Sequence, residues 1–166
     1  MVTKNNVVAQ AAQAAQASNA HQTAETSPSG SPSNLAYFVG AWQLNRQILQ
    51  SSGEVFVFEG QADFSWAESD LHYHESGVVT APDGRTLQAE RTYVWRQQAG
   101  GKIEVLFDDN RYFHTFSAAE PYAKHLCGDD LYVVSYALED GPRWESMWQV
   151  KGPRKDYKMT SLYQRA

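Results

Sequence analysis

Arg91 is the residue whose surroundings point most directly to ligand binding. Its neighbours at every second position are apolar: Leu87, Ala89, Tyr93 and Trp95. On a β-strand these residues share one face, which places a guanidinium group in an apolar row. An isolated charge in an apolar interior is too costly to persist, so Arg91 must be paired or solvated. Three interpretations stay open: an ion pair with Glu75 that fixes strand register, an anchor for the carboxylate or phosphate of a ligand, or a surface position.

Two histidines are the candidate catalytic residues. His114 has Tyr112 and Phe116 at alternate positions, so we expect it on an aromatic face. His125 lies two residues before Cys127, and a catalytic thiol would need such a base nearby. A small buried thiol beside a hydrogen-bonded imidazole explains the same spacing. As general bases, these histidines would act with a cation that stabilises developing negative charge.

Imidazole and thiolate groups are also ligands for zinc, copper and iron. His72 and His74 project from one face of a predicted strand, whereas Tyr73 and Glu75 project from the other. His-x-His spacing is compatible with one metal ion, but no tight cluster of cysteine and histidine supports it. We therefore predict no metal site and identify no cofactor.

The remaining candidates lie in one aromatic row and one turn. Tyr136 alternates with Tyr132, Val134 and Leu138. In the turn from Lys151 to Asp156, Gly-Pro restricts the backbone and presents Arg154 beside Lys155. A carboxylate or phosphate there could form two hydrogen bonds with the Arg154 guanidinium. Alternatively, Asp156 pairs with Arg154 or caps the turn. The predicted ligand-binding set is Arg91, His114, Tyr93, Glu75, His74, Tyr136 and Arg154.

Strands must position these side chains, because apolar and polar residues alternate through most of the chain. The pattern is clearest from Glu54 to Trp66, where every second residue is aromatic or small. Similar patterns predict strands over 42–49, 71–80, 86–96, 102–107, 111–116, 131–138, 143–150 and 157–163. The separators are rich in Gly, Pro, Asp and Asn, which suit tight turns. Only Leu35 to Phe38 is predicted helical, as one turn capped by Asn34.

Strands joined by short connections predict an all-β fold, a closed antiparallel meander barrel of about eight to ten strands. Residues 1–33 contain no aromatic residue and end in a Ser-Pro-Ser-Gly run, so we expect a disordered leader. Residues 34–166 form the predicted single barrel domain.

Charge and composition exclude several classes of protein. The formal net charge is -5, and residues 1–33 hold only Lys4 and Glu25, so all of it belongs to the barrel. An acidic domain is poorly suited to nucleic acid. No stretch approaches about 18 consecutive apolar residues, and the leader matches neither a signal peptide nor a mitochondrial presequence. The single cysteine gives no sign of an oxidising compartment, and we expect a cytoplasmic protein.

The two ends of the predicted barrel resemble those of calycins, which include lipocalins and fatty-acid-binding proteins. Leu35-x-x-Phe38-x-Gly40-x-Trp42 precedes the strands, and Arg165 ends the last one. In calycins the Trp plugs one end and the Arg packs across it, bonding carbonyl groups of the leading turn. The resemblance implies structural roles for Gly40, Trp42 and Arg165. It also argues against haem, because nitrobindin-like calycins carry the proximal His late in the chain.

More of the chain is similar to DUF6314, a family with no established activity. The matching segments begin at Phe38, Tyr73, Arg91, Phe107, His125 and Gly152 and cover essentially residues 35 to 165. The resemblance implies the fold and leaves the chemistry open.

These observations support a protein that binds a small molecule in an aromatic-lined barrel, the ligand carrying an anionic group oriented by Arg91 and His114. The alternative is an enzyme that uses the same cavity, with a His general base and Arg91 as electrostatic stabiliser. A third possibility is a solidly packed barrel that acts through its surface. For the enzyme hypothesis, Arg46 serves as the comparison position, expected to lie away from the chemistry. The sequence makes no prediction of oligomeric state.

Overall fold

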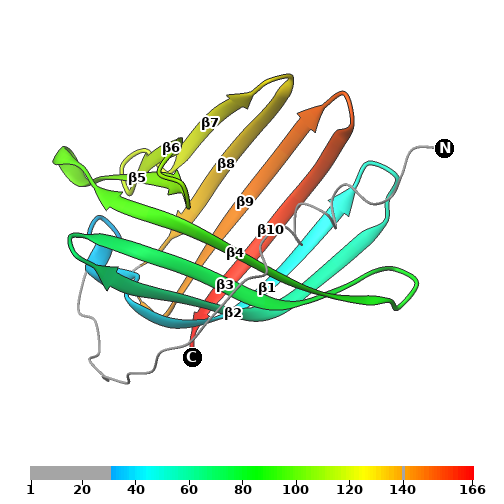
Figure 1. Cartoon of the computed structure of the whole chain (residues 1–166), viewed down its shortest axis with the longest axis horizontal. Coiled ribbons are helices and arrows are strands. Elements are labelled where there is room, and N and C mark those ends of the chain that lie inside the picture. Colours follow the sequence, from blue (N-terminus) through cyan, green and yellow to red (C-terminus); the bar gives the residue numbers. More distant parts are fainter. Residues whose placement is uncertain (1–30, 140) are drawn as a thin grey trace.

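A computed structural model describes residues 31–139 and 141–166 of the chain. The predicted leader therefore lies outside the described residues, except for Ser31 to Ser33. The described part is almost entirely β-structure (Figure 1), and its elements are η1 (Leu35–Tyr37), β1 (Gly40–Gln50), β2 (Val55–Ala67), β3 (Asp70–Thr80), β4 (Thr86–Gln97), η2 (Ala99–Gly101), β5 (Lys102–Phe107), β6 (Tyr112–Ser117), β7 (Tyr122–Cys127), β8 (Asp130–Leu138), β9 (Arg143–Gly152) and β10 (Lys155–Arg165).

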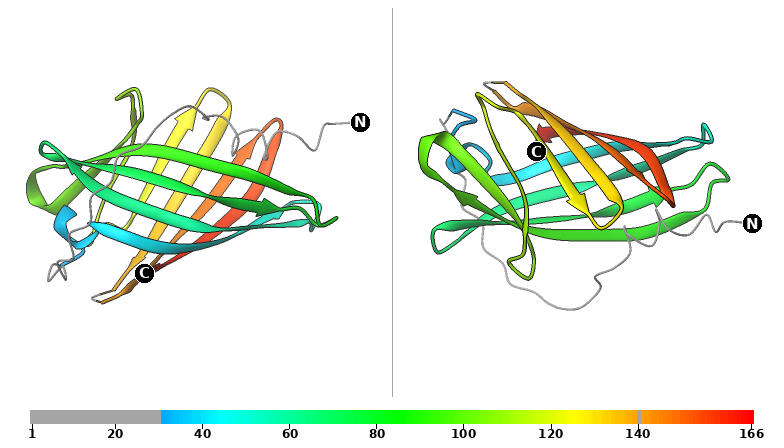
Figure 2. Two further views of the ribbon diagram at one scale, coloured as in Figure 1. Left: turned by 60° about the horizontal axis from the view of Figure 1, so that its bottom comes forward. Right: turned by 90° about the horizontal axis from the view of Figure 1, so that it is seen from above.

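The strands form one antiparallel sheet in the order β6-β5-β4-β3-β2-β1-β10-β9-β8-β7. Strands that follow each other in sequence pair in the sheet, except β6 and β7, and β1 also pairs with β10, with Trp42 opposite Arg165. The sheet curls so that β6 and β7, at the two ends of this order, lie next to each other (Figures 1 and 2). The result is a nearly closed barrel, which confirms the predicted fold class.

Nine of the ten strands match predicted segments, and β7 is the one that was missed. Its residues, Tyr-Ala-Lys-His-Leu-Cys, do not alternate between apolar and polar types. A second difference is a β-bulge, where the register between β5 and β6 shifts at Val105 and Leu106. Phe113 is the extra residue, so Phe113 and His114 are both buried and Tyr112 is exposed. The prediction that Tyr112 shares the face of His114 was therefore wrong.

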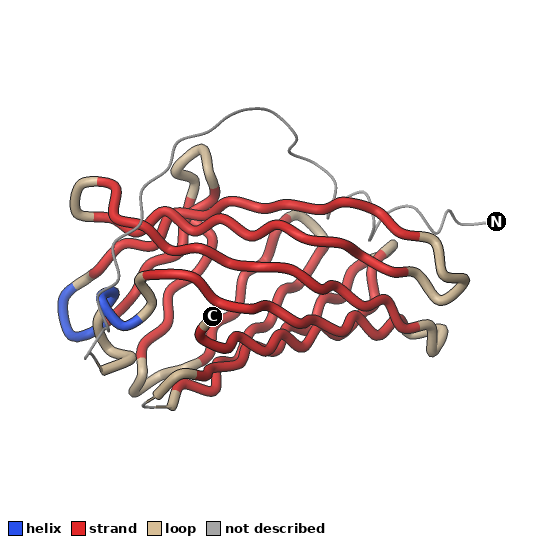
Figure 3. Tube along the Cα trace, turned by 90° about the horizontal axis from the view of Figure 1, so that it is seen from below, coloured by secondary structure: helices blue, strands red, loops and turns tan. Residues whose placement is uncertain are grey.

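One end of the barrel is sealed by the residues that resemble the calycin ends. Asn34 caps η1 through a 2.9 Å hydrogen bond from the Ala36 amide, as predicted. Trp42 is fully buried and donates from Nε1 to the Phe38 carbonyl at 2.8 Å. The Arg165 guanidinium lies over the Trp42 ring at 3.9 Å and donates to carbonyl groups of Tyr37 and Val39. Both 3-10 helices lie at this closed end (Figure 3).

A close approach of two strands explains a glycine pair in the wall. Gly60 on β2 lies opposite Gly77 on β3. A Cβ atom on Gly77 would lie 2.3 Å from the Glu59 carbonyl oxygen and 2.8 Å from the Phe58 ring. The Phe58 ring therefore lies over this glycine pair, and a larger residue at either position would displace the facing strand or the ring.

Candidate functional site

The barrel encloses a hollow, here called the inner cavity. It lies between the closed end and the opposite end of the barrel, here called the mouth. The centres of water-sized groups can occupy about 70 Å³ there. Its wall consists mainly of rings, among them Trp95, Trp144, Trp148, Tyr93, Tyr132, Tyr136, Tyr157 and Phe113. Arg46, Glu75 and Arg91 are the charged side chains in that wall. The barrel interior is therefore hollow and not solidly packed.

A second hollow, here called the vestibule, lies at the mouth end of the inner cavity. It measures about 280 Å³ on the same basis, and its lining includes Thr92, Phe107, Asp108, His125 and Cys127. Five residues line both spaces: Arg91, Tyr93, Phe113, Tyr132 and Tyr157. The two hollows are therefore neighbours that share part of one wall.

Arg91 lies where these spaces meet. It comes from the inward face of β4 and lines the inner cavity, the vestibule and a smaller pocket beside Arg46 and Glu75. Its Nη1 donates to the Tyr93 hydroxyl at 3.3 Å. Burial opposes the charged form, but nearby Tyr93 and Glu75 raise the pKa of Arg91 on balance. Arg91 is therefore a permanent cation at the junction.

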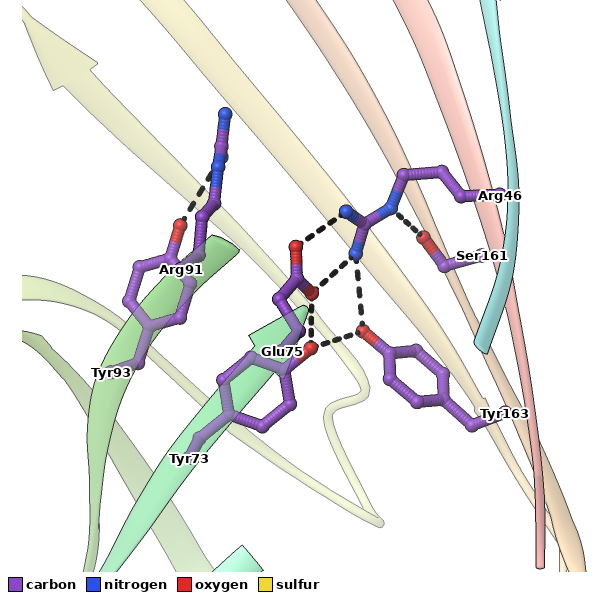
Figure 4. Close-up of polar contacts among 7 residues, drawn as sticks. All are labelled: Arg46, Tyr73, Glu75, Arg91, Tyr93, Ser161 and Tyr163. Atoms are coloured by element: carbon purple, nitrogen blue, oxygen red, sulfur yellow. Dashed lines mark hydrogen bonds and ion pairs between the residues drawn. The ribbon is translucent and has the colours of Figure 1, made fainter. Parts of the chain in front are cut away.

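The strongest partner of Glu75 is Arg46 (Figure 4). Although Glu75 and Arg91 are directly opposite in the β3–β4 register, Arg46 on β1 binds both Glu75 oxygens, at 2.6 and 2.7 Å. Arg46 Nε also donates to Ser161 at 2.7 Å. Tyr73 donates to Glu75, and the Tyr73 and Tyr163 hydroxyls lie 3.1 Å apart. This network links β3 to β1 and β10, along neighbouring strands of the sheet.

The described residues that line the inner cavity keep their charged and neutral groups well defined. Burial favours the neutral form of Glu75, yet Arg46 holds its pKa below the ordinary value, so the carboxylate is charged. Burial raises the pKa values of Tyr73, Tyr136 and Tyr163, which keeps these hydroxyls neutral. Among the described residues, the wall therefore contributes two guanidinium groups and one carboxylate.

His114 is a neutral group in the same cavity. Only 2% of it is exposed, and its Nε2 lies 2.7 Å from the Tyr136 hydroxyl. Burial, reinforced by the nearby His125, lowers the pKa of His114 to about 3. Its Nδ1, like Trp144 Nε1, is buried without a hydrogen-bond partner among the described residues. Buried polar atoms without a partner are uncommon in proteins, so these two nitrogen atoms are available to bond a group in the cavity.

The structure brings together five of the seven predicted ligand-binding residues and separates two. Arg91, His114, Tyr93, Glu75 and Tyr136 line the inner cavity. His74 does not, because strand alternation places it on the outer face, where its Nε2 lies 3.6 Å from Glu90. Arg154 is exposed in the β9–β10 turn. Its neighbour Lys155 points back instead, and bonds Asp130 at 2.9 Å and Tyr132 at 3.0 Å.

Sequence reasoning also misplaced Arg46. It is 8% exposed and part of the cavity wall, so it is not a neutral comparison position. The signal was present, because Arg46 alternates with the buried Trp42, Leu44 and Ile48 on β1. His125, the second candidate base, lines the vestibule and not the inner cavity. Within residues 31–139 and 141–166, no three His, Cys, Asp or Glu side chains are grouped to hold a metal ion.

Comparison with known proteins identifies the family. Residues 38–165 match the family described as "Family of unknown function (DUF6314)". The chain belongs to the DUF6314 family. Among solved structures, this DUF6314 chain is similar to a de novo designed fluorescence-activating β-barrel, with a TM-score of 0.41 and 12% identity over 78% of this chain and 94% of the designed one. No curated protein matches the sequence. None of the helices in the described segments is long and apolar enough to cross a membrane.

Proposed function

We propose that the DUF6314 protein binds a small organic anion that carries an aromatic ring. The ring occupies the inner cavity, and the anionic group lies against Arg91. The observation that carries this proposal is the guanidinium charge of Arg91 in a wall made mainly of aromatic rings. An anionic group would neutralise that charge in a site of low dielectric, where the attraction is strong. A single cysteine and an acidic surface are consistent with a cytoplasmic protein that does not bind nucleic acid.

The size of the inner cavity limits the ligand. If each water-sized group takes about 10–15 Å³ of such space, 70 Å³ holds roughly five to seven groups. One six-membered ring fits this number. Planar rings also match the wall, because ring pairs gain stabilisation when they stack or meet edge to face.

Titration with phenylacetate tests the proposal, with fluorescence of the three lining tryptophans as the signal. We expect saturable binding of phenylacetate and much weaker binding of phenylacetamide, its neutral analogue. Arg91→Gln should weaken phenylacetate binding roughly 10- to 150-fold, the range for a hydrogen bond to a charged group. Arg85→Gln is the matched control, because Arg85 lies exposed in the β3–β4 turn and pairs with Asp83. Equal binding of phenylacetate and phenylacetamide would refute the role of Arg91.

Native mass spectrometry of protein purified from its own host gives an independent test. A retained small molecule that carries a carboxylate or phosphate supports the proposal. A retained neutral or cationic molecule contradicts it.

Catalysis in the same cavity is the alternative. Arg91 shares the inner cavity with His114 and the vestibule with His125. A general base works best when its pKa lies near the working pH, and a pKa of about 3 makes His114 a weak base. His125, which lines the vestibule with Arg91, is the other candidate base. Turnover lost in His125→Ala and retained in Arg85→Ala supports an enzyme, whereas equal turnover in the two variants contradicts it.

A further inference from the structure

We infer that the vestibule is a second subsite, which takes a neutral apolar group of the same ligand. This inference rests on the proposed function and extends it to a ligand class. The ligand is an organic acid whose anionic group lies between two apolar groups, a ring in the inner cavity and a second group in the vestibule.

The position of Arg91 places the anion in the middle of the ligand. Arg91 lines the inner cavity on one side and the vestibule on the other. An anionic group bound to it therefore lies at the junction, with space in both directions. The vestibule is about four times as large as the inner cavity on the same measure, 280 against 70 Å³. A ligand that ended at its anionic group would leave this larger space to solvent.

The vestibule wall is a preformed cluster of rings. Phe107 and Phe113 stack with centroids 4.5 Å apart and planes 10° apart. His125 and Tyr132 meet the Phe113 ring edge to face, at 5.2 and 6.0 Å. Because these rings already pack against each other, a ligand would not have to order them, which reduces the entropic cost of binding.

Charge in the vestibule disfavours a second anionic group. Asp108, which is exposed, lines it together with Arg91. Near Tyr132, Lys155 is already paired with Asp130 at 2.9 Å. A second anion would therefore meet a carboxylate, while a neutral apolar group would contact the rings. The second group of the ligand is therefore uncharged.

Diphenylacetate is the probe, because its carboxylate lies between two phenyl rings. Phenylacetate has the same carboxylate and one ring. We expect diphenylacetate to bind about tenfold more tightly, since its second ring removes apolar surface from water. Phe107→Ala should reduce this advantage, measured as the ratio of the affinities for the two acids. Tyr112→Ala is the matched control, because Tyr112 is exposed on the outside of the adjacent strand.

The only cysteine provides a second readout without mutation. Cys127 is exposed and lines the vestibule. Saturating diphenylacetate should slow the reaction of Cys127 with a thiol reagent about fivefold or more, because a vestibule group that buries apolar surface also covers the thiol. Saturating phenylacetate should leave the rate unchanged.

The outcomes separate the two proposals. Failure of both acids to bind overturns the proposed function and the inference with it. Binding of phenylacetate, combined with equal affinity for diphenylacetate and an unprotected Cys127, overturns the second subsite alone. Protection of Cys127 by phenylacetate would place the first ring in the vestibule, and this also overturns the inference.

Discussion

Replacing His114 with glutamine should flatten the acid dependence of the free energy of unfolding. Histidine in an unfolded chain has a pKa near 6.5, whereas burial lowers the pKa of His114 in the barrel to about 3. Between these two values the unfolded chain binds a proton that the folded chain does not. Stability must therefore fall as the pH is lowered through this range. From about pH 7 to pH 5, one such group removes about 2 kcal/mol.

The pH window separates His114 from the buried carboxylate. Burial by itself would raise the pKa of Glu75, but the opposing effect of Arg46 is stronger. The pKa of Glu75 therefore lies below its ordinary value of 4.5. Stability linked to Glu75 is therefore fully present above that value and is lost only at lower pH. Measurements at and above about pH 5 report mainly on the histidine.

Urea unfolding, followed by tryptophan fluorescence at several pH values, measures the effect. The difference in stability between pH 7 and pH 5 should be about 2 kcal/mol smaller in His114→Gln than in the wild type. His72→Gln is the matched control, because His72 is exposed on the outer face of β3. An unchanged pH dependence in His114→Gln would refute the reasoning. If that variant does not fold, NMR of the wild-type imidazoles decides the question, since a protonated His114 at pH 5 gives the same refutation.

Three further predictions concern the wall and the closed end, each measured by urea unfolding. Glu75→Leu should cost about 3–5 kcal/mol because it leaves the Arg46 charge buried without its carboxylate, and adding Arg46→Met should recover much of that loss; additive losses would contradict the ion pair. Trp42→Ala should cost about 3–5 kcal/mol and leave phenylacetate affinity of the folded protein unchanged; weaker binding at full stability would move Trp42 into the site. Gly77→Ala should cost about 1–3 kcal/mol through its clash with the facing strand, and Ser76→Ala, on the exposed face, should not; equal costs would contradict the close approach.

Local patterns were sufficient for most of the fold. Alternation and turn residues predicted nine strands, because the side-chain period of a strand and the turn preferences of Gly, Pro, Asn and Asp act over a few residues. The β2–β3 turn carries no such residue at its left-handed position, where Glu68 has φ of 59°. It was still implied by the strands on either side. β7 had no alternation to reveal it, and only its pairing with β8 defines it as a strand.

Site residues were harder to predict. The alternation of residue types along a strand shows on which face a side chain lies, but it does not show which residue that side chain pairs with. It placed Arg91 inside correctly, and the same rule applied to β1 would have placed Arg46 there too. It could not show that Glu75 pairs with Arg46 across two strands in preference to Arg91 directly opposite. The bulge at Phe113 changed the faces of β6 without any local signal.

The sequence by itself indicated nine strands and most of their inward rows and favoured an inward position for Arg91, because these depend on the order of residues close in the chain. Only the tertiary structure decided which cations and carboxylate meet, that His114 is neutral and that Arg91 lies between two hollows. These properties arise when β1 pairs with β10, more than 100 residues away, and the barrel closes. Closure brings together side chains whose distances and burial no local pattern specifies.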